Sequence, residues 1–235
     1  MPDTILVIPG FLAPRISEIV FYGALMETLK ANHQRVVFEN IPFLGFGNLE
    51  HEAAIIAKRH MRGTEGNFKI VTHSLGSVVA MKLAEWYPKR VKLIVALAPP
   101  YDGTIWADPF GAAARMLRIP IPKINLPFQV AQVLKPHSQI LAEMRAFLAD
   151  AEHYTVTAVG NNDRTVWPLT SAFLEGPRIL NHLAGPADWH ETRAGLVIPN
   201  RATNIITRCD IHHRNIVTDE GVLEFVIDAL RVHGH

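Results

Sequence analysis

The segment Val71-Thr72-His73-Ser74-Leu75-Gly76 carries the strongest structural signal in this chain of 235 residues. It joins a predicted strand at residues 68–72 to a predicted helix at residues 75–87, which ends before Pro88. A serine at such a junction is typical of a nucleophile elbow, in which a strained turn exposes the hydroxyl at the start of the helix. The pattern alone also fits a strand end followed by a helix cap, but the flanking strand and helix favour the elbow. Ser74 is therefore the predicted nucleophile.

Strand-sized apolar runs recur on both sides of this segment. The predicted strands cover residues 5–9, 35–40, 68–72, 91–98, 154–160 and 204–208. The run at 91–98 is apolar almost throughout, which indicates burial on both faces, as in a parallel sheet covered by helices. The sequence therefore predicts an α/β fold with one doubly wound, mostly parallel sheet of about six strands, within one domain over residues 1–235.

Helical patterns separate the predicted strands. They cover residues 17–32, 48–62 and 75–87, and a last helix starts at Thr218 or Asp219. Asn48 is the predicted N-cap of the second of these helices. Two segments interrupt the alternation. Residues 101–150 are rich in proline and apolar side chains and are predicted to be an insertion, and residues 168–200 carry turn signals and are predicted to be irregular.

The composition excludes several classes of protein. Hydrophobic residues make up 49% of the chain and charged residues 19%, which argues against intrinsic disorder. The net charge of +1 gives no sign of a nucleic-acid partner. No apolar run reaches the roughly 18 residues that a transmembrane helix needs, and the single cysteine, Cys209, excludes an internal disulfide. The N-terminal sequence lacks the cationic start of a signal peptide, so we expect a cytoplasmic protein, or a secreted one if a leader precedes this sequence.

A nucleophilic serine needs a base, and the base needs a third group to hold it. On sheets of this kind the serine is followed along the chain by an acid and then by a histidine. Asp163 lies just after the predicted strand 154–160, at a carboxyl strand end, and is the predicted acid. Asp102, which follows the strand 91–98, is the alternative acid. Asp163 could also do no more than close a turn.

Two adjacent histidines follow the last predicted strand. We predict that His213 is the base, with His212 as the alternative, because Ile216 would anchor the loop three residues after His213. Asp210, His212 and His213 could in principle bind a metal ion. Side chains of adjacent residues on an extended chain point in opposite directions, however, so we expect no metal site.

An acyl-transfer site must also stabilise an oxyanion, and backbone N–H groups are the usual donors. The amide that directly follows the predicted nucleophile, that of Leu75, is one predicted donor. The second is the amide of Phe11, in the loop after the first strand, where Gly10 allows the backbone to turn. Gly10 also fits an ordinary turn between a strand and a helix.

Taken together, these motifs resemble the α/β-hydrolase superfamily, and most closely its small bacterial lipases and carboxylesterases. The resemblance spans roughly residues 3–230. Its motifs are the oxyanion loop at 8–11, the elbow at 72–76, the link at 87–91, the acid loop at 160–166 and the histidine loop at 213–216. Pro9 stands where the family usually has histidine, and Thr72 stands where it usually has glycine.

The resemblance implies a serine hydrolase of carboxylic esters that uses no cofactor. Ser74 would attack the ester carbonyl, His213 would move the proton, and Asp163 would hold the imidazole. The segment 101–150 lies where the family carries a helical cap or lid, in which Trp106, Phe110 and Leu117 would bind an apolar acyl group of a small ester or lipid. The alternative is that these side chains pack beneath the cap and never contact substrate. A thioesterase, an amidase or a carbon–carbon hydrolase would use the same triad, and a non-catalytic binding protein could share the scaffold.

Overall fold

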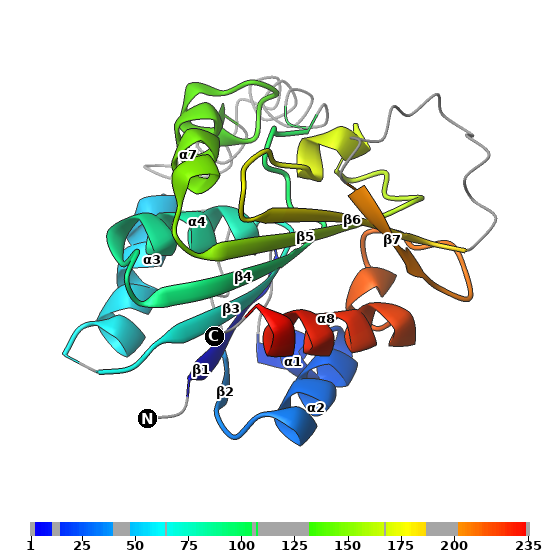
Figure 1. Cartoon of the computed structure of the whole chain (residues 1–235), viewed down its shortest axis with the longest axis horizontal. Helices are drawn as coiled ribbons and strands as arrows, with labels where there is room; N and C mark the ends of the chain where they lie inside the picture. Colours follow the sequence, from blue (N-terminus) through cyan, green and yellow to red (C-terminus); the bar gives the residue numbers. More distant parts are fainter. Residues whose placement is uncertain are drawn as a thin grey trace, which may run out of the picture.

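A seven-stranded sheet forms the centre of the part of the chain that this computed structural model describes: residues 3–10, 15–39, 48–63, 65–104, 107, 132–166, 168–186 and 202–233. The strand order is β2-β1-β3-β4-β5-β6-β7, and every neighbouring pair is parallel (Figure 1). The strands are β1 (Thr4–Ile8), β2 (Val36–Phe38), β3 (Phe68–His73), β4 (Val91–Leu97), β5 (Tyr154–Gly160), β6 (Ile179–Gly185) and β7 (Ala202–Ile206). The predicted doubly wound α/β fold is confirmed.

The strand order reverses between β1 and β3. From β1 the chain moves outward to β2 at one edge, and then crosses back to β3 on the other side of β1. At such a switch point the connecting segments leave the carboxyl ends of the two strands in opposite directions and open a crevice, which is where α/β sheets bind ligands. Gly10 follows β1 and Ser74 follows β3, so both residues lie at this point.

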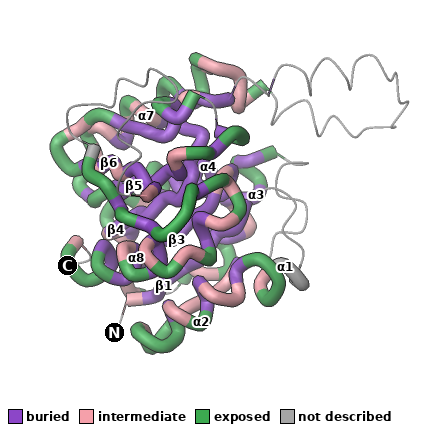
Figure 2. The backbone as a smooth tube through the Cα atoms, turned by 90° about the vertical axis from the view of Figure 1, so that its right-hand side faces the viewer, coloured by how far each residue is buried: buried purple, intermediate pink, exposed green. Residues whose placement is uncertain are grey.

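Helices cover both faces of the sheet. On one face lie α1 (Arg15–Val20), α2 (Gly23–Asn32) and α8 (Glu220–Val232), and on the other lie α3 (Leu49–Ile56), α4 (Gly76–Trp86) and α7 (Gln139–Asp150) (Figure 1). Along β1, Ile5 and Val7 belong to one apolar core and Leu6 and Ile8 to the other. This two-sided burial explains why the central strands, largely buried in Figure 2, are apolar almost throughout. Within the described ranges, no helix has the length and apolarity that crossing a bilayer requires.

Side-chain caps start three of these helices. Asn48 accepts the backbone N–H of Glu50 at the start of α3, as predicted. Asp219 accepts the N–H of Val222 at the start of α8, which settles the predicted choice between Thr218 and Asp219. Ser138 caps α7 in the same way. After Ile56, α3 continues as a short π-helix, η1 (Ala57–Met61), so the predicted helix 48–62 has the right extent but changes its winding.

Two parts of the fold differ from the sequence prediction. The segment 168–200, predicted to be irregular, contains the strand β6, which raises the count from about six strands to seven. Polar Asn181 and His182 in the middle of β6 hide its apolar pattern. The single helix predicted over residues 17–32 is two helices, with a break at Phe21 and Tyr22. Of the predicted insertion 101–150, the described residues are 101–104, 107 and 132–150, and the division of the chain into a domain and a cap stays a prediction.

Candidate active site

Ser74 occupies a sharp turn between β3 and α4. Its φ angle is +52°, in the left-handed region that costs a residue with a side chain about 1–3 kcal/mol. Its own N–H donates to the carbonyl of Leu97 on β4, at 2.8 Å, which fixes the turn to the sheet. Two residues later, a Cβ on Gly76 would lie 2.4 Å from the carbonyl oxygen of Pro9, so β1 and the start of α4 are in direct backbone contact. This is the geometry of a nucleophile elbow.

Thr72 replaces the glycine that is usual two residues before such a serine. Its side chain is buried, and its hydroxyl lies 2.7 Å from the buried hydroxyl of Ser77 in the first turn of α4. Each hydroxyl satisfies the other, so the threonine leaves no unpaired polar group beneath the elbow.

His213 links Ser74 to Asp163. Its Nε2 lies 2.9 Å from the Oγ of Ser74, and its Nδ1 lies 2.8 Å from the Oδ2 of Asp163. A carboxylate can only accept a hydrogen bond, so the proton of the neutral imidazole sits on Nδ1 and Nε2 is free to accept from the serine hydroxyl. The His213 side chain is 16% exposed, and the Asp163 side chain is fully buried.

The carboxylate of Asp163 is held by its own loop. Its Oδ1 accepts the backbone N–H groups of Thr165 and Val166, at 2.8 and 2.9 Å. These two bonds are the turn that the sequence also allowed, and they leave Oδ2 for His213. A buried carboxylate needs charge-assisted hydrogen bonds to offset its lost hydration, and here it accepts three of them.

The loops that carry Asp163 and His213 are joined at their bases. A Cβ on Gly160 would lie 2.1 Å from the carbonyl oxygen of Ile211, so only glycine fits at the end of β5. Asn161 accepts the N–H of Ile211 through its side chain and donates to Asp210. These contacts bring the two loops together although they lie about 50 residues apart in the sequence.

The alternative residues lie elsewhere. His212 is exposed, its ring faces Asn215, and its N–H donates to the Asn215 side chain. Asp102 forms an ion pair with Arg145, and its Oδ2 lies 3.3 Å from the Nδ1 of His137. The structure thus brings Ser74, His213 and Asp163 together and leaves His212 and Asp102 outside that set.

Of the two predicted oxyanion donors, Leu75 is described. It is the N-cap residue of α4, so its N–H has no acceptor within the helix and lies at the positive end of the helix dipole. Phe11 lies outside the described residues. Its neighbour Gly10 packs tightly on the elbow, because a Cβ there would lie 3.1 Å from the Cβ of Ser74.

Sequence reasoning missed two residues that contact this site. The ring of His73 is buried between the hydroxyl of Tyr22, 2.8 Å from Nδ1, and the carbonyl oxygen of His213, 2.8 Å from Nε2. Burial lowers the pKa of His73 to about 3, and the neighbouring His213 adds to this effect. Burial also raises the pKa of Tyr22 to about 12. The position of His73 inside the elbow motif was a signal for this role, but nothing in the sequence pointed to Tyr22.

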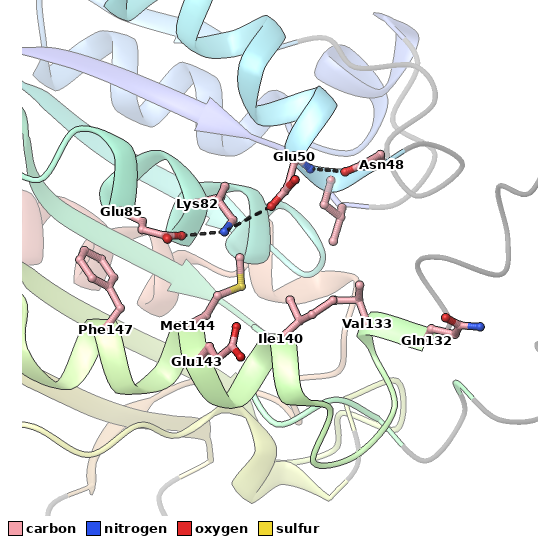
Figure 3. Close-up of a pocket in the computed structure, with 11 residues that line it drawn as sticks. Asn48, Glu50, Lys82, Glu85, Gln132, Val133, Ile140, Glu143, Met144 and Phe147 are labelled. Atoms are coloured by element: carbon pink, nitrogen blue, oxygen red, sulfur yellow. Dashed lines mark hydrogen bonds and ion pairs between the residues drawn. The ribbon is translucent and has the colours of Figure 1, made fainter.

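Two pockets lie near the elbow helix α4 and the histidine loop. One, of about 400 Å³, lies between α3, α4 and α7, where Lys82 is paired with Glu50 and Glu85 (Figure 3). The other, of about 300 Å³, lies beside His213 and is lined by Asn162, Arg164, Thr165, His212, His213 and Arg214. The residues predicted to contact substrate, Trp106, Phe110 and Leu117, lie outside the described residues.

Comparison with known proteins supports the fold. No family model and no curated protein matches the chain. Among solved structures, lipase B of Aspergillus fumigatus has a TM-score of 0.66 at 15% identity, over 99% of this chain and 53% of the lipase. The monoacylglycerol lipase of Paleococcus ferrophilus has a TM-score of 0.63 at 16% identity, over 99% of this chain and 96% of the lipase. MGS-MChE2, an α/β-hydrolase enzyme from a lagoon-sediment metagenome, has a TM-score of 0.61 at 12% identity, over 100% and 93%.

These likenesses define the class of fold. The chain has the α/β-hydrolase fold that the sequence motifs predicted, and it is structurally similar to two lipases and to a further α/β-hydrolase enzyme. It spans about half the length of the fungal lipase and nearly the whole length of the archaeal one.

Proposed function

We propose that this protein is a serine hydrolase that cleaves carboxylic esters through a covalent acyl-enzyme. The observation that carries the proposal is the hydrogen-bonded series Ser74–His213–Asp163 at the switch point of the sheet. Its distances of 2.9 and 2.8 Å are those required for proton transfer from a nucleophile to a base that is oriented by an acid. The two lipases of similar fold agree with this chemistry.

The proposed reaction has two halves. In the first, Ser74 Oγ attacks the ester carbonyl while His213 Nε2 takes the hydroxyl proton, and the carbonyl oxygen becomes an oxyanion. The C–O bond to the alcohol then breaks, and His213 returns the proton to the leaving oxygen. In the second half, water donates its proton to His213 and attacks the acyl carbon, and Ser74 leaves with that proton as the acid product is released.

Fixed groups stabilise the charges that develop. The N–H of Leu75, at the start of α4, donates to the oxyanion, and the N–H of Phe11 is proposed as the second donor. Asp163 keeps the imidazole proton on Nδ1 and stabilises the imidazolium that forms when His213 accepts the serine proton. We assign the acyl group to Trp106, Phe110 and Leu117, and therefore propose a preference for short-to-medium apolar acyl groups on a small-molecule ester or a lipid.

Turnover of aryl esters tests the proposal. The wild type should hydrolyse p-nitrophenyl esters with an optimum at apolar acyl chains, and Ser74→Ala and His213→Ala should lower kcat by a factor on the order of 10³ or more. Ser171→Ala is the matched control. The Ser171 hydroxyl is buried without a hydrogen-bond partner in the described part of the chain, so its removal should change neither folding nor turnover. Wild-type turnover by Ser74→Ala would reject the proposal, and a preference for charged acyl groups would reject the assigned substrate class.

A further inference from the structure

We propose that His73 is a positioning residue which, together with Tyr22, holds the backbone of His213 so that its imidazole meets Ser74. This inference rests on the proposed function, because it assigns His73 a part in orienting the proposed base. It depends on three hydrogen bonds that join the end of β1, the start of α2, the elbow and the histidine loop.

The direction of these hydrogen bonds can be worked out from their chemistry. The carbonyl oxygen of His213 can only accept, so Nε2 of His73 carries the proton and donates. The other ring nitrogen, Nδ1, is then an acceptor for the hydroxyl of Tyr22. The Tyr22 oxygen in turn accepts the N–H of Gly10, at 3.0 Å. Every polar group in this series is satisfied in one arrangement only, so the contacts cannot be interchanged. We call the hydrogen-bonded series Gly10–Tyr22–His73–His213 the strut.

The strut acts on the backbone of the base itself. His213 is fixed at three atoms: its carbonyl oxygen by His73, its Nδ1 by Asp163, and its Nε2 by Ser74. Asn161 holds the base of the loop, but at His213 itself the bond to His73 is the one contact among the described residues that fixes the backbone. Productive geometry at a catalytic group tolerates displacements of only about 0.5 Å.

The same strut reaches the proposed oxyanion loop. Gly10 directly precedes Phe11, and its N–H is bound by Tyr22. A Cβ on Gly10 would lie 3.2 Å from Nδ1 of His73, so this backbone rests directly on the ring. His73 and Tyr22 therefore couple the position of the base to the loop that is proposed to bind the oxyanion.

His73 must stay neutral for this role. Its ring centroid lies 4.8 Å from that of His213, which becomes a cation each time it takes the serine proton. Burial and the charge of His213 disfavour a proton on Nδ1 of His73, whereas the His213 carbonyl and Asp163 favour it. The balance is a pKa of about 3 for His73, so its ring stays neutral and keeps one tautomer at pH values well above 3.

Three variants test the strut by steady-state turnover of an aryl ester. His73→Phe keeps the ring shape but removes both hydrogen bonds, and Tyr22→Phe removes only the hydroxyl. We expect both to lower kcat, His73→Phe by about 10- to 100-fold, with KM nearly unchanged, because binding groups stay in place while the base is displaced. His73→Gln offers an amide N–H to the carbonyl of His213, and should recover a large part of the lost kcat.

The readouts separate a positioning role from a purely structural one. Each kcat is referred to the folded fraction found by urea unfolding, and Ser74→Ala is assayed beside the three variants. Wild-type kcat in His73→Phe or in Tyr22→Phe, a rise in KM in place of the fall in kcat, or no recovery in His73→Gln would overturn the inference. If His73→Phe does not fold, Tyr22→Phe and His73→Gln still decide it. Activity that survives in Ser74→Ala would instead reject the proposed function.

Discussion

At the scale of single residues, the site depends on which oxygen of Asp163 and which nitrogen of His213 remain available for a further hydrogen bond. Oδ1 of Asp163 is occupied by two backbone N–H groups, so only Oδ2 faces His213. That leaves the imidazole one tautomer, with its proton on Nδ1 and its lone pair directed at Ser74. The two main-chain amides thus help to orient the lone pair that the proposed reaction needs on Nε2 of His213.

This arrangement predicts a large effect for Asp163→Asn. The backbone N–H groups of Thr165 and Val166 would bind the amide oxygen and turn the NH2 group toward His213. The imidazole would then carry its proton on Nε2 and could no longer accept one from Ser74. We expect kcat to fall by a factor on the order of 10³–10⁴ with the fold intact.

Asp102→Asn is the matched comparison for this variant. Asp102 is partly exposed, paired with Arg145 and close to His137, away from Ser74, so its replacement should leave kcat within about twofold of wild type. Measuring kcat for both variants on one ester decides between the two acids. Loss of activity in Asp102→Asn rather than in Asp163→Asn would show that the proposed acid is wrong.

At the scale of elements, the elbow exists because β1, β3 and α4 approach one another at backbone distance. A Cβ on Gly76 would meet the carbonyl oxygens of Pro9 and Ile8 at 2.4 and 2.5 Å. Neither oxygen belongs to a flexible side chain that could move aside. The contact therefore sets the angle at which α4 leaves the sheet, and with it the position of Ser74.

Gly76→Ala should consequently destabilise the protein and reduce turnover together. Relieving the clash requires α4 to shift, at a cost of about 3 kcal/mol or more in the free energy of unfolding. Gly23→Ala is the control, since the nearest atom to its Cβ would be 4.0 Å away at the start of α2, and it should be neutral or slightly stabilising. Urea unfolding of both variants checks this. Equal stability of the two would contradict the close approach.

The strands also explain which parts of the fold and of the candidate site could be predicted from the sequence. Strand β4 was predictable because each of its faces meets an apolar layer, and Ser74, Asp163 and His213 were predictable because each follows a recognisable strand. Strand β6 was not, because its buried Asn181 is satisfied by Thr157 and by the backbone of Leu174, contacts that only the assembled sheet provides. Tyr22 could not be placed either, since its partner His73 lies 51 residues away.

At the scale of the whole molecule, the candidate active site and a buried histidine, His153, lie at opposite ends of the sheet. His153 directly precedes β5, at the amino end, whereas Ser74 follows the carboxyl end of β3. Both ring nitrogens of His153 are buried without a hydrogen-bond partner in the described ranges. Burial, with a smaller contribution from Arg178, lowers its pKa to about 4. Acid should therefore affect the stability of the fold through a group that is remote from the chemistry.

The lowered pKa of His153 determines how the stability of the fold depends on pH. The unfolded chain binds a proton at His153 near pH 6.5 and the folded chain only near pH 4. The contribution of neutral His153 to the free energy of unfolding is therefore complete above pH 6.5 and is lost as the pH falls to 4. The loss amounts to about 3 kcal/mol in the free energy of unfolding.

Comparing His153→Phe with the wild type isolates this contribution. The variant keeps an aromatic ring beside Phe147 and has no group to protonate, so its stability relative to wild type should grow as the pH falls from 7 to 4. Gly23→Ala, which changes no titratable group, is the control, and its difference from wild type should stay constant with pH. Urea unfolding at several pH values gives the answer. A constant difference between variant and wild type would show that His153 does not titrate as described.

Mass spectrometry after reaction with a fluorophosphonate shows whether Ser74 is an activated nucleophile, because this reagent is captured only by a serine activated by a base. We expect one adduct per chain, carried on Ser74, and loss of the adduct in both Ser74→Ala and His213→Ala. An unmodified wild-type protein, or an adduct on any other residue, would contradict it.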